Sequence, residues 1–337
     1  MTLTGLPTPA EAARHLNWGA EALWQQLDPL LPGLSVEVVG HVDSTNTRLL
    51  DRARAHSGQR DGPVSRPGDL ESLQDVAARS GTPFGRRVAD VQPCLLVAEH
   101  QTRGRGRLGR DWVSSAGASL TFSLSLALHP ADWSGLSLGV GLALAEALDP
   151  MPAGGQPKIV LKWPNDLWLL DPSLGPGRGR KLGGVLIETV SVGLHRMCVV
   201  GVGLNVLPVA VEPAGQPAPA ALTHGYASLN EIDATLDAPS TLARVAAPLV
   251  QALLRFQSDG FAPLAPAYAR RDVLFGQSIA TTQPEVPEGV ADGVDERGAL
   301  RVRCGTLHQL VSGEVSVRLQ SAELGSMEPP QPGTRAS

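Results

Sequence analysis

The sequence predicts an α+β protein in which helices pack on a mixed or antiparallel sheet, followed by a small β-barrel module. Three observations carry this prediction. Residues 158–206 contain several strand-like apolar runs separated by short turns, which is typical of an antiparallel meander. Apolar runs with helical spacing flank that region on both sides. From residue 272 onward the predicted elements are short strands at close spacing, and such spacing favours a small closed barrel.

Length and composition describe a globular chain. Its 337 residues are 42% hydrophobic and 18% charged, and the net charge of −5 argues against a general affinity for nucleic acid. Cys94, Cys198 and Cys304 lack zinc-site spacing, so we expect reduced structural thiols. No apolar run reaches the ~18 residues that span a membrane, and the N-terminus lacks a signal-peptide pattern. We therefore expect a soluble, cytoplasmic protein.

Helices are expected within the first 271 residues, and strands between residues 34 and 319. Residues 10–31 have helical spacing with a break at Gly19, but the segment is too short and too poor in basic residues for a complete DNA-binding domain. The other expected helices are 48–55, 69–80, 134–148, 240–258 (capped by Ser240 and kinked or divided at Pro248) and 262–271. The expected strands are 34–39, 93–98, 120–128, 159–161, 167–170, 181–188, 197–205, 273–280, 289–295, 300–304, 306–311 and 314–319.

A glycine–arginine loop, residues 103–112, lies between two of these strands. Its residues of interest are Gly104, Gly106 and Gly109, the arginines Arg103, Arg105, Arg107 and Arg110, and the closing Trp112. Glycines let the backbone pass close to a ligand, and arginines offer forked donors to carboxylate or phosphate. The pattern predicts a mobile loop that becomes ordered over a small bound anion.

The same loop contains GRGRLG at 104–109, which formally matches the dinucleotide-binding fingerprint GxGxxG. That fingerprint requires a helix directly after the third glycine. Residues 111–117 are followed here by a strand, so we reject a dinucleotide site. The sequence also contains no GxxxxGK[ST], which excludes a P-loop nucleotide site.

Two other groups of residues admit both a structural and a functional interpretation. Ser44, Thr45 and Asn46 stand between a strand and a helix, where they could cap the helix or bind a polar ligand group. Lys162 and Lys181 could be solvated charges at strand ends or phosphate-binding point charges. Asp166 could form a structural pair with Lys162 or hold Mg²⁺ beside substrate phosphates.

Five motifs together resemble the biotin protein ligases, also called biotin–[acetyl-CoA-carboxylase] ligases, in order and approximate spacing. They are DSTN at 43–46, GRGRLGR at 104–110, KWPND at 162–166, KLGGVLIE at 181–188 and GVGLN at 201–205. The resemblance covers roughly residues 34–320. It implies a class II synthetase-like catalytic domain at 34–271, with a mixed seven-stranded sheet and helices on one side, and an SH3-like domain at 272–320. A short helical segment at 1–33 and a disordered tail at 321–337 complete the expected organisation.

The resemblance implies a reaction in two steps. Biotin and MgATP would give biotinyl-5′-AMP and pyrophosphate, and biotin would then pass to a lysine of a biotin carboxyl carrier protein domain. The implied catalytic residues are Arg107, Lys181 and Asp166, with Asp166 also the candidate Mg²⁺ ligand and base. The implied biotin-binding residues are Ser44, Thr45, Asn46, Gln101, Arg105, Gly106, Arg107, Lys181 and Gly184. The implied nucleotide-binding residues are Arg107, Arg110, Trp112, Lys162, Asn165, Lys181 and Asn205.

Finer roles follow from the same resemblance. Arg105 and Arg107 would bind the acyl-phosphate. Trp163 and the glycine-lined strands are candidates for the apolar tunnel around the valeryl chain of biotin. The family pattern is not matched at Leu108, where an arginine is frequent. Charge at the loop is kept by Arg103, one residue before the first glycine.

Two other functions stay open at this point. A lipoate or octanoate ligase has the same fold, although the arginines before Ser-Gly-Gly that are usual there are absent. A DNA-binding biotin sensor needs a basic recognition helix, and residues 10–31 hold only Arg14 and His15, so we expect no DNA partner. We expect no membrane partner either. A homodimer is one option, but the sequence gives neither the oligomeric state nor the identity of the acceptor.

Overall fold

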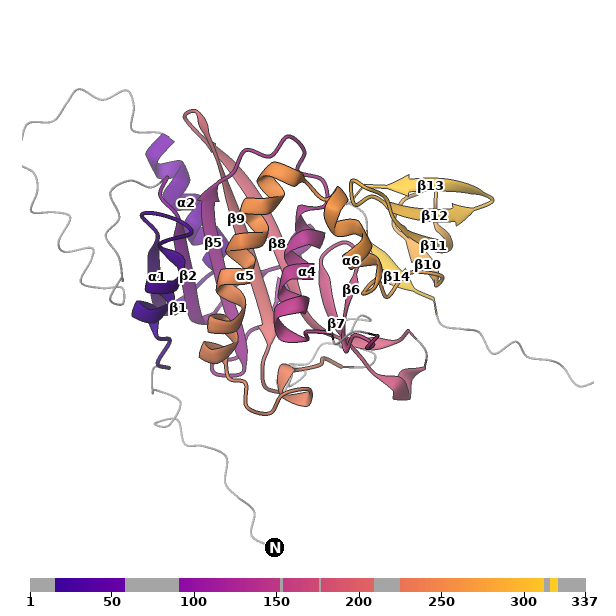
Figure 1. Cartoon of the computed structure of the whole chain (residues 1–337), viewed down its shortest axis with the longest axis horizontal. Coiled ribbons are helices and arrows are strands. Elements are labelled where there is room, and N and C mark those ends of the chain that lie inside the picture. Colours follow the sequence, from indigo (N-terminus) through magenta and orange to yellow (C-terminus); the bar gives the residue numbers. More distant parts are fainter. Residues whose placement is uncertain are drawn as a thin grey trace, which may run out of the picture.

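The computed structural model describes residues 16–57, 91–151, 154–175, 177–208, 225–311 and 316–320. Their centre is a seven-stranded sheet with the order β1-β2-β5-β9-β8-β7-β6 (Figure 1). In that order the strands are β1 (Ser35–Val42), β2 (Cys94–Gln101), β5 (Ser119–Ala127), β9 (His195–Asn205), β8 (Gly179–Val192), β7 (Asp166–Leu170) and β6 (Ile159–Lys162). Within this sheet β1 and β2 run parallel, and the other neighbours are antiparallel. The predicted α+β class, mixed sheet and antiparallel meander are confirmed.

Helices cover both faces of this sheet. On one face α5 (Ala238–Asp259) packs against α1 (Ala20–Leu27) and α4 (Leu136–Leu148), as Figure 1 shows. α2 (Thr45–Ser57) packs on the opposite face. Alternate residues of β2 reveal the two faces, because Leu95 belongs to the core under α4 and α5, whereas Leu96 packs with Leu49 and Leu50 of α2. The expectation of helices on one side is therefore wrong for α2.

The structure confirms the predicted break before α1 and corrects the predicted cap of α5. Gly19 precedes α1 in a left-handed conformation (φ 57°), which confirms the break predicted there. α5 is capped by Asp237, whose carboxylate accepts the Ser240 N–H at 2.8 Å, so Ser240 is not the cap. α5 also continues through Pro248 as one helix, since its apolar face is buried against the core. The predictions for residues 10–15, 69–80 and 321–337 lie outside the described residues.

Short elements complete the large domain. They are β3 (Gly104–Arg105), β4 (Asp111–Trp112), α6 (Ala265–Ala269) and 3₁₀ turns at Arg107–Gly109, Pro172–Leu174, Leu229–Glu231 and Ala262–Leu264. The segment predicted as one helix at 262–271 is thus a 3₁₀ turn followed by a single short helix. Arg271, at the end of this segment, is buried and donates to the Asp149 carboxylate at 2.9 Å and to the Ile159 carbonyl at 2.7 Å.

The C-terminal module is a five-stranded antiparallel sheet with the order β13-β12-β11-β10-β14. Its strands are β10 (Ser278–Thr281), β11 (Glu288–Val294), β12 (Leu300–Cys304), β13 (Thr306–Leu310) and β14 (Val317–Leu319). β10 begins later than predicted, and residues 314–315 of the predicted last strand lie outside the described residues. One continuous apolar core joins the module to the large sheet, and Trp163 lies fully buried at the junction, where Nε1 donates to the Gly298 carbonyl at 3.0 Å.

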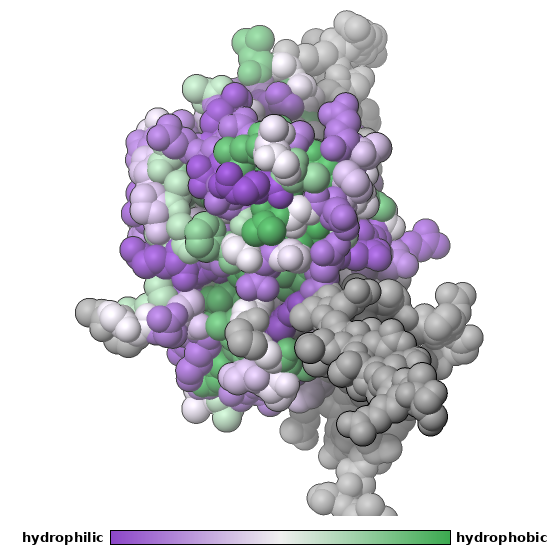
Figure 2. All heavy atoms as spheres, turned by 90° about the vertical axis from the view of Figure 1, so that its right-hand side faces the viewer, coloured by the Kyte–Doolittle hydropathy of each residue, from purple (hydrophilic) through white to green (hydrophobic). Residues whose placement is uncertain are grey.

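The surface of the molecule on the side of this module is mixed. Figure 2 shows hydrophobic groups scattered among hydrophilic ones on that side. Exposed apolar side chains of the module are Phe275, Val290, Leu307 and Val311. Within the described ranges, no helix has the length and apolar character needed to cross a membrane.

Candidate active site

A cavity of about 1260 Å³ lies on the α2 face of the sheet. It is bounded by the start of α2, the glycine–arginine loop, the glycines of β8 and β9, and β14. The volume exceeds the ~300–1,000 Å³ of a typical small-molecule pocket, so it offers room for two ligands side by side. The predicted site residues that line it are Ser44, Thr45, Asn46, Gln101, Arg105, Gly106, Arg107, Arg110, Trp112, Lys162, Asn165, Asp166, Lys181 and Gly184.

One end of the cavity, the polar end, is a network of neutral hydrogen-bonding groups. Gln101 Oε1 accepts from the backbone N–H of Thr45 at 2.7 Å, with Thr45 Oγ1 at 3.1 Å. Ser123 Oγ lies 2.6 Å from both Thr45 Oγ1 and Asn46 Oδ1. These groups are buried, and Ser44 beside them accepts weakly from the N–H of Thr47 at 3.4 Å. Ser44 is thus placed at the start of α2 as a cap would be, and Ser44, Thr45 and Asn46 also line the cavity.

Two glycines of β9 make room for this arrangement. A Cβ atom at Gly201 would lie 2.3 Å from Asn46 Oδ1, and one at Gly203 would lie 2.5 Å from Trp112 Cε2. Any side chain at these positions would displace Asn46 or Trp112. The glycines of the GVGLN motif thus let the polar end and the indole rest directly on the sheet.

The glycine–arginine loop is a small hairpin in which β3 pairs with β4. Gly106 N–H donates to the Arg110 carbonyl at 2.6 Å, and a 3₁₀ turn forms the tip. Gly109 (φ 68°) uses the conformational freedom of glycine, whereas Leu108 adopts a left-handed conformation (φ 57°) without it. Gly104 is required by close approach, since its Cβ would lie 2.3 Å from the Trp112 carbonyl oxygen. A strand, not a helix, follows the loop, which agrees with rejecting a dinucleotide site.

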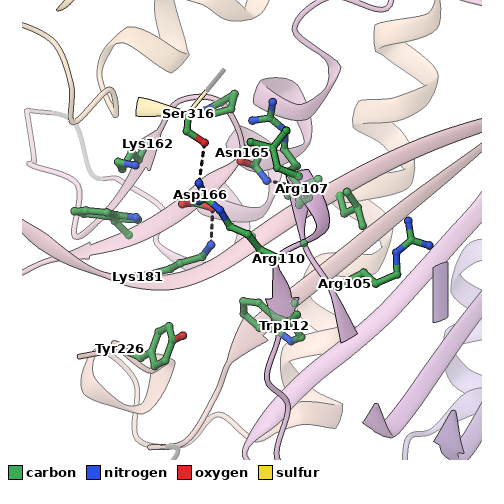
Figure 3. A pocket seen from close by; sticks show the side chains of 18 of the residues that line it. Arg105, Arg107, Arg110, Trp112, Lys162, Asn165, Asp166, Lys181, Tyr226 and Ser316 are labelled. Atoms are coloured by element: carbon green, nitrogen blue, oxygen red, sulfur yellow. Dashed lines mark hydrogen bonds and ion pairs between the residues drawn. The ribbon is translucent and has the colours of Figure 1, made fainter. Parts of the chain in front are cut away.

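The other end of the cavity, the cationic end, gathers positive side chains around one carboxylate (Figure 3). Lys181 Nζ pairs with Asp166 Oδ1 at 2.7 Å and lies 6.0 Å from the centre of the Trp112 ring. Asp166 therefore pairs with Lys181, not with Lys162 as the structural interpretation held. Lys162 instead donates to the Val317 carbonyl at 2.8 Å and lies 5.2 Å from the Trp168 ring centre.

Burial of these cations shifts their acid–base equilibria. Burial lowers the pKa of Lys162, an effect that Asp166 partly opposes and neighbouring cations reinforce. Burial also lowers the pKa of the Arg107 guanidinium, again opposed by Asp166. Lys162 and Arg107 line the same end of the cavity as Arg110 and Lys181, around the Asp166 carboxylate. Such a site favours an anionic ligand.

Three side chains do not occupy the places that the predicted roles require. The Arg105 guanidinium donates to Thr47 Oγ1 at 3.0 Å and to Glu188 Oε1 at 2.6 Å, away from Lys181 and Asp166 (Figure 3), so its position does not support acyl-phosphate binding. Asn205 is buried and donates to the Ala227 carbonyl at 3.1 Å, outside the cavity lining. Trp163 is buried at the junction with the C-terminal module and does not line the cavity, so its proposed tunnel role is wrong.

The cavity also contains residues that the sequence did not reveal. Tyr226 lies opposite Trp112, and burial, followed by the charge of Asp166, raises the pKa of its phenol. The C-terminal module contributes Ser316, which accepts from Arg110 Nη2 at 2.9 Å, and Arg318. Tyr226 is anchored to the KLGG motif, because the N–H of Ala227 donates to the Lys181 carbonyl at 2.9 Å. No local sequence pattern marks these positions, since each reaches the cavity through the tertiary fold.

Comparison with known proteins adds an independent line of argument. The family described as Biotin/lipoate A/B protein ligase family matches residues 91–205. The bifunctional ligase/repressor BirA of Escherichia coli (strain K12) is 31% identical over 318 residues, which cover 93% of this chain and 80% of that protein. The biotin–[acetyl-CoA-carboxylase] ligase of Mycobacterium tuberculosis is 30% identical over 319 residues, with coverages of 93% and 97%.

A solved structure supports the same fold. Biotin protein ligase from Aquifex aeolicus, solved in complex with biotin and ATP, superposes with a TM-score of 0.57 at 24% identity, covering 85% of this chain and 99% of that one. Fold and sequence together place the molecule in the broad class of biotin and lipoate ligases. Within that class, the chain belongs to the biotin protein ligase family.

Proposed function

We propose that this protein activates biotin with MgATP to give biotinyl-5′-AMP and pyrophosphate, and then transfers biotin to a lysine of a biotin carboxyl carrier protein domain. The observation that carries the proposal is one continuous cavity with a neutral, hydrogen-bonding end and a cationic end. The ureido ring of biotin is polar but uncharged and suits the first end. Its carboxylate and the α-phosphate of ATP are anions and suit the second.

The polar end would recognise the ureido ring. Ser44 and Thr45 supply hydroxyl groups, and the Gln101 side-chain amide has its oxygen committed to Thr45, which leaves its nitrogen as a donor. That nitrogen would lie 3.2 Å from a Cβ atom at Gly104, so it sits next to the glycine–arginine loop. Gly184 lies beside the Lys181–Asp166 pair, since a Cβ atom there would be in van der Waals contact with Lys181 Nζ at 3.6 Å.

The cationic end would promote adenylation. This step joins two anions, so the enzyme must reduce the repulsion between carboxylate and phosphate. Lys181 and Arg107 provide preorganised positive charge, and a preorganised donor is typically worth ~10²–10³ in rate. Arg110, Lys162 and Asn165 would contact the nucleotide from the same end, with Trp112 as a flat surface beside it.

Magnesium fits this site as an ion that arrives with ATP. Within the described ranges no group of three or more His, Cys, Asp or Glu side chains could hold a metal by itself. Mg²⁺ usually takes one or two carboxylates and completes its shell with water and substrate phosphates. Asp166 lines the cationic end and would provide that carboxylate. When bound, the ion would add positive charge against the phosphates.

The glycine–arginine loop would protect the intermediate. Biotinyl-AMP is an acyl-phosphate anhydride, so water must be excluded until the acceptor arrives. The loop forms one wall of the cavity, and Arg110 at its end contacts Ser316 of the C-terminal module. The acceptor lysine would then attack the acyl carbon, AMP would leave, and Asp166 is the candidate base for the lysine proton.

Partner and location follow from the same proposal. We propose a biotin carboxyl carrier protein domain as acceptor, a cytoplasmic location and no DNA-binding role. The described part of the N-terminal segment, residues 16–33, contains no lysine or arginine. A recognition helix requires basic residues to contact DNA phosphates. Operator binding by the purified protein at low salt with biotin present would contradict this part.

The proposal is tested by incubating the purified protein with labelled ATP, Mg²⁺ and one of three acids: biotin, lipoate or octanoate. Of the three acids, we expect only biotin to give pyrophosphate release and an acyl-AMP product. Pyrophosphate release that depends on lipoate or octanoate and not on biotin would instead show a lipoate or octanoate ligase. The same assay without any acid measures background hydrolysis.

A further inference from the structure

Glu188, the last residue of the KLGGVLIE motif, joins two separate parts of the cavity wall. Its Oε1 accepts from Arg105 Nη2 at 2.6 Å, and its Oε2 accepts from Asn46 Nδ2 at 3.0 Å. Arg105 belongs to the glycine–arginine loop, and Asn46 belongs to the polar end. One carboxylate therefore connects the loop with the place where we propose that biotin binds.

The contact with Glu188 fixes the orientation of the Asn46 amide. Asn46 Nδ2 also donates to the Leu186 carbonyl at 3.2 Å, and Asn46 Oδ1 accepts from Ser123 Oγ at 2.6 Å. A flipped amide would place its oxygen against a carbonyl and a carboxylate, which can only accept. Both amide hydrogens are thus committed to the protein. Asn46 acts mainly by holding Thr45 and Ser123 in place, because it has no hydrogen left to donate to a ligand.

Arg105 is fixed in a similar way. Its guanidinium bridges Glu188 of β8 and Thr47 of α2, with N–O distances of 2.6 and 3.0 Å. The Arg105 backbone lies in β3, which pairs with β4. The ion pair therefore attaches the base of the glycine–arginine loop to the sheet and to α2. It is partly exposed, with 45% of the Arg105 side chain and 24% of the Glu188 side chain accessible, so it can open.

We infer that Glu188 is a positioning residue that couples closure of the glycine–arginine loop to the geometry of the polar end. The inference rests on the proposed function. When the loop is closed, Arg105 and Asn46 share the carboxylate, and the Thr45–Ser123–Asn46 network is held. By linkage, a ligand that binds the held network favours the closed loop, and the closed loop slows release of that ligand.

The test compares Glu188→Gln with a matched control, Glu37→Gln. Glu37 of β1 pairs with Arg52 of α2 at 2.7 Å, also between a strand and α2, and its contacts within the described ranges, with Arg52 and Cys94, are separate from the loop and the polar end. The measurements are the release rate of preformed biotinyl-AMP, the KM for biotin and the melting temperature. We expect release about three- to tenfold faster in Glu188→Gln, the range for a partly exposed charge-assisted contact. The control should stay within about twofold of wild type.

A double-mutant cycle separates coupling from a general structural effect. If Glu188 acts through Arg105, Glu188→Gln should add little to the release rate in an Arg105→Gln background. Fully additive effects, or unchanged release and KM in Glu188→Gln, would overturn the inference. Should Glu188→Gln not fold, Arg105→Gln removes the same ion pair at an exposed side chain and is expected to speed release equally. A wild-type protein that forms no biotinyl-AMP would instead contradict the proposed function.

Discussion

Replacement of Lys181 by alanine tests the cationic end most sharply. Lys181 Nζ lies 2.7 Å from Asp166 Oδ1 and 6.0 Å from the Trp112 ring centre, so the ammonium is already in place before substrates bind. Loss of one such preorganised donor typically costs ~10²–10³ in rate, which is about 2.7–4 kcal/mol of transition-state stabilisation. We expect single-turnover formation of biotinyl-AMP to slow by that factor in Lys181→Ala.

The same variant should remain folded. The Lys181–Asp166 pair is partly accessible, with 32% and 19% of the two side chains exposed, so its loss should cost about 1 kcal/mol or less of stability. That is small beside the ~5–15 kcal/mol that stabilises a typical domain.

The chain offers a matched control. Lys158, Lys162 and Lys181 are its three lysines, and Lys158 is exposed just before β6, outside the cavity. Rapid-quench measurement of adenylate formation should show wild-type kinetics for Lys158→Ala. Adenylation by Lys181→Ala within twofold of wild type would refute the assigned role of Lys181.

Three further predictions address the loop, the polar end and the junction with the C-terminal module. Arg107→Ala should slow adenylate formation and also speed biotinyl-AMP leakage; an unchanged lifetime of the bound intermediate would show that the loop does not enclose it. Gly201→Ala should raise the KM for biotin about tenfold or more, because its Cβ would lie 2.3 Å from Asn46 Oδ1. Gly141→Ala, whose Cβ would meet only a side-chain carbon at 3.4 Å, is the control, and equal KM values would contradict this explanation. Burial raises the pKa of Asp272 to about 6, so the folded state binds that proton more tightly than the unfolded state does. The stabilisation that the protonated Asp272 carboxyl provides is therefore fully present below about pH 4. It is lost as the pH rises to about 6, which lowers the free energy of unfolding by about 2–3 kcal/mol. Urea unfolding of Asp272→Asn should therefore show a growing stability advantage over wild type between those pH values, and a constant difference would contradict the assignment.

Sequence patterns predicted the strands of the large sheet well, because burial on both faces requires long apolar runs there. Gly201 and Gly203 of the GVGLN motif each admit a close neighbour, which the sequence alone does not name. The structure identifies the neighbours as Asn46 and Trp112. Both come from distant segments, so only the tertiary fold could reveal which group each glycine admits.

The pairing of Asp166 could not be derived from spacing. Lys162 faces Asp166 across the β6–β7 hairpin, which favours the local pair. A register shift between Leu167 and Trp168, however, sets Gly184 opposite Asp166 and brings Lys181 to it from the neighbouring strand. A bulge of this kind adds one residue to a strand and leaves no clear mark in an alternating apolar pattern.

Residues that approach from outside the large sheet were missed for a related reason. Tyr226 follows a long Pro/Ala-rich stretch, and Ser316 belongs to the C-terminal module. Their places depend on contacts such as Ala227 N–H to the Lys181 carbonyl and Trp163 to the Gly298 carbonyl. Such contacts are made between segments far apart in the chain, and local propensity does not encode them.

Transfer to an acceptor tests the central claim most directly. The purified protein, biotin, ATP and Mg²⁺ are incubated with a biotin carboxyl carrier protein domain, and the intact mass of that domain is measured. We predict a gain of one biotinyl group, dependent on ATP and on biotin, and no gain when the acceptor lysine is replaced by arginine. An unmodified acceptor, under conditions where a known biotin ligase modifies it, would contradict the account.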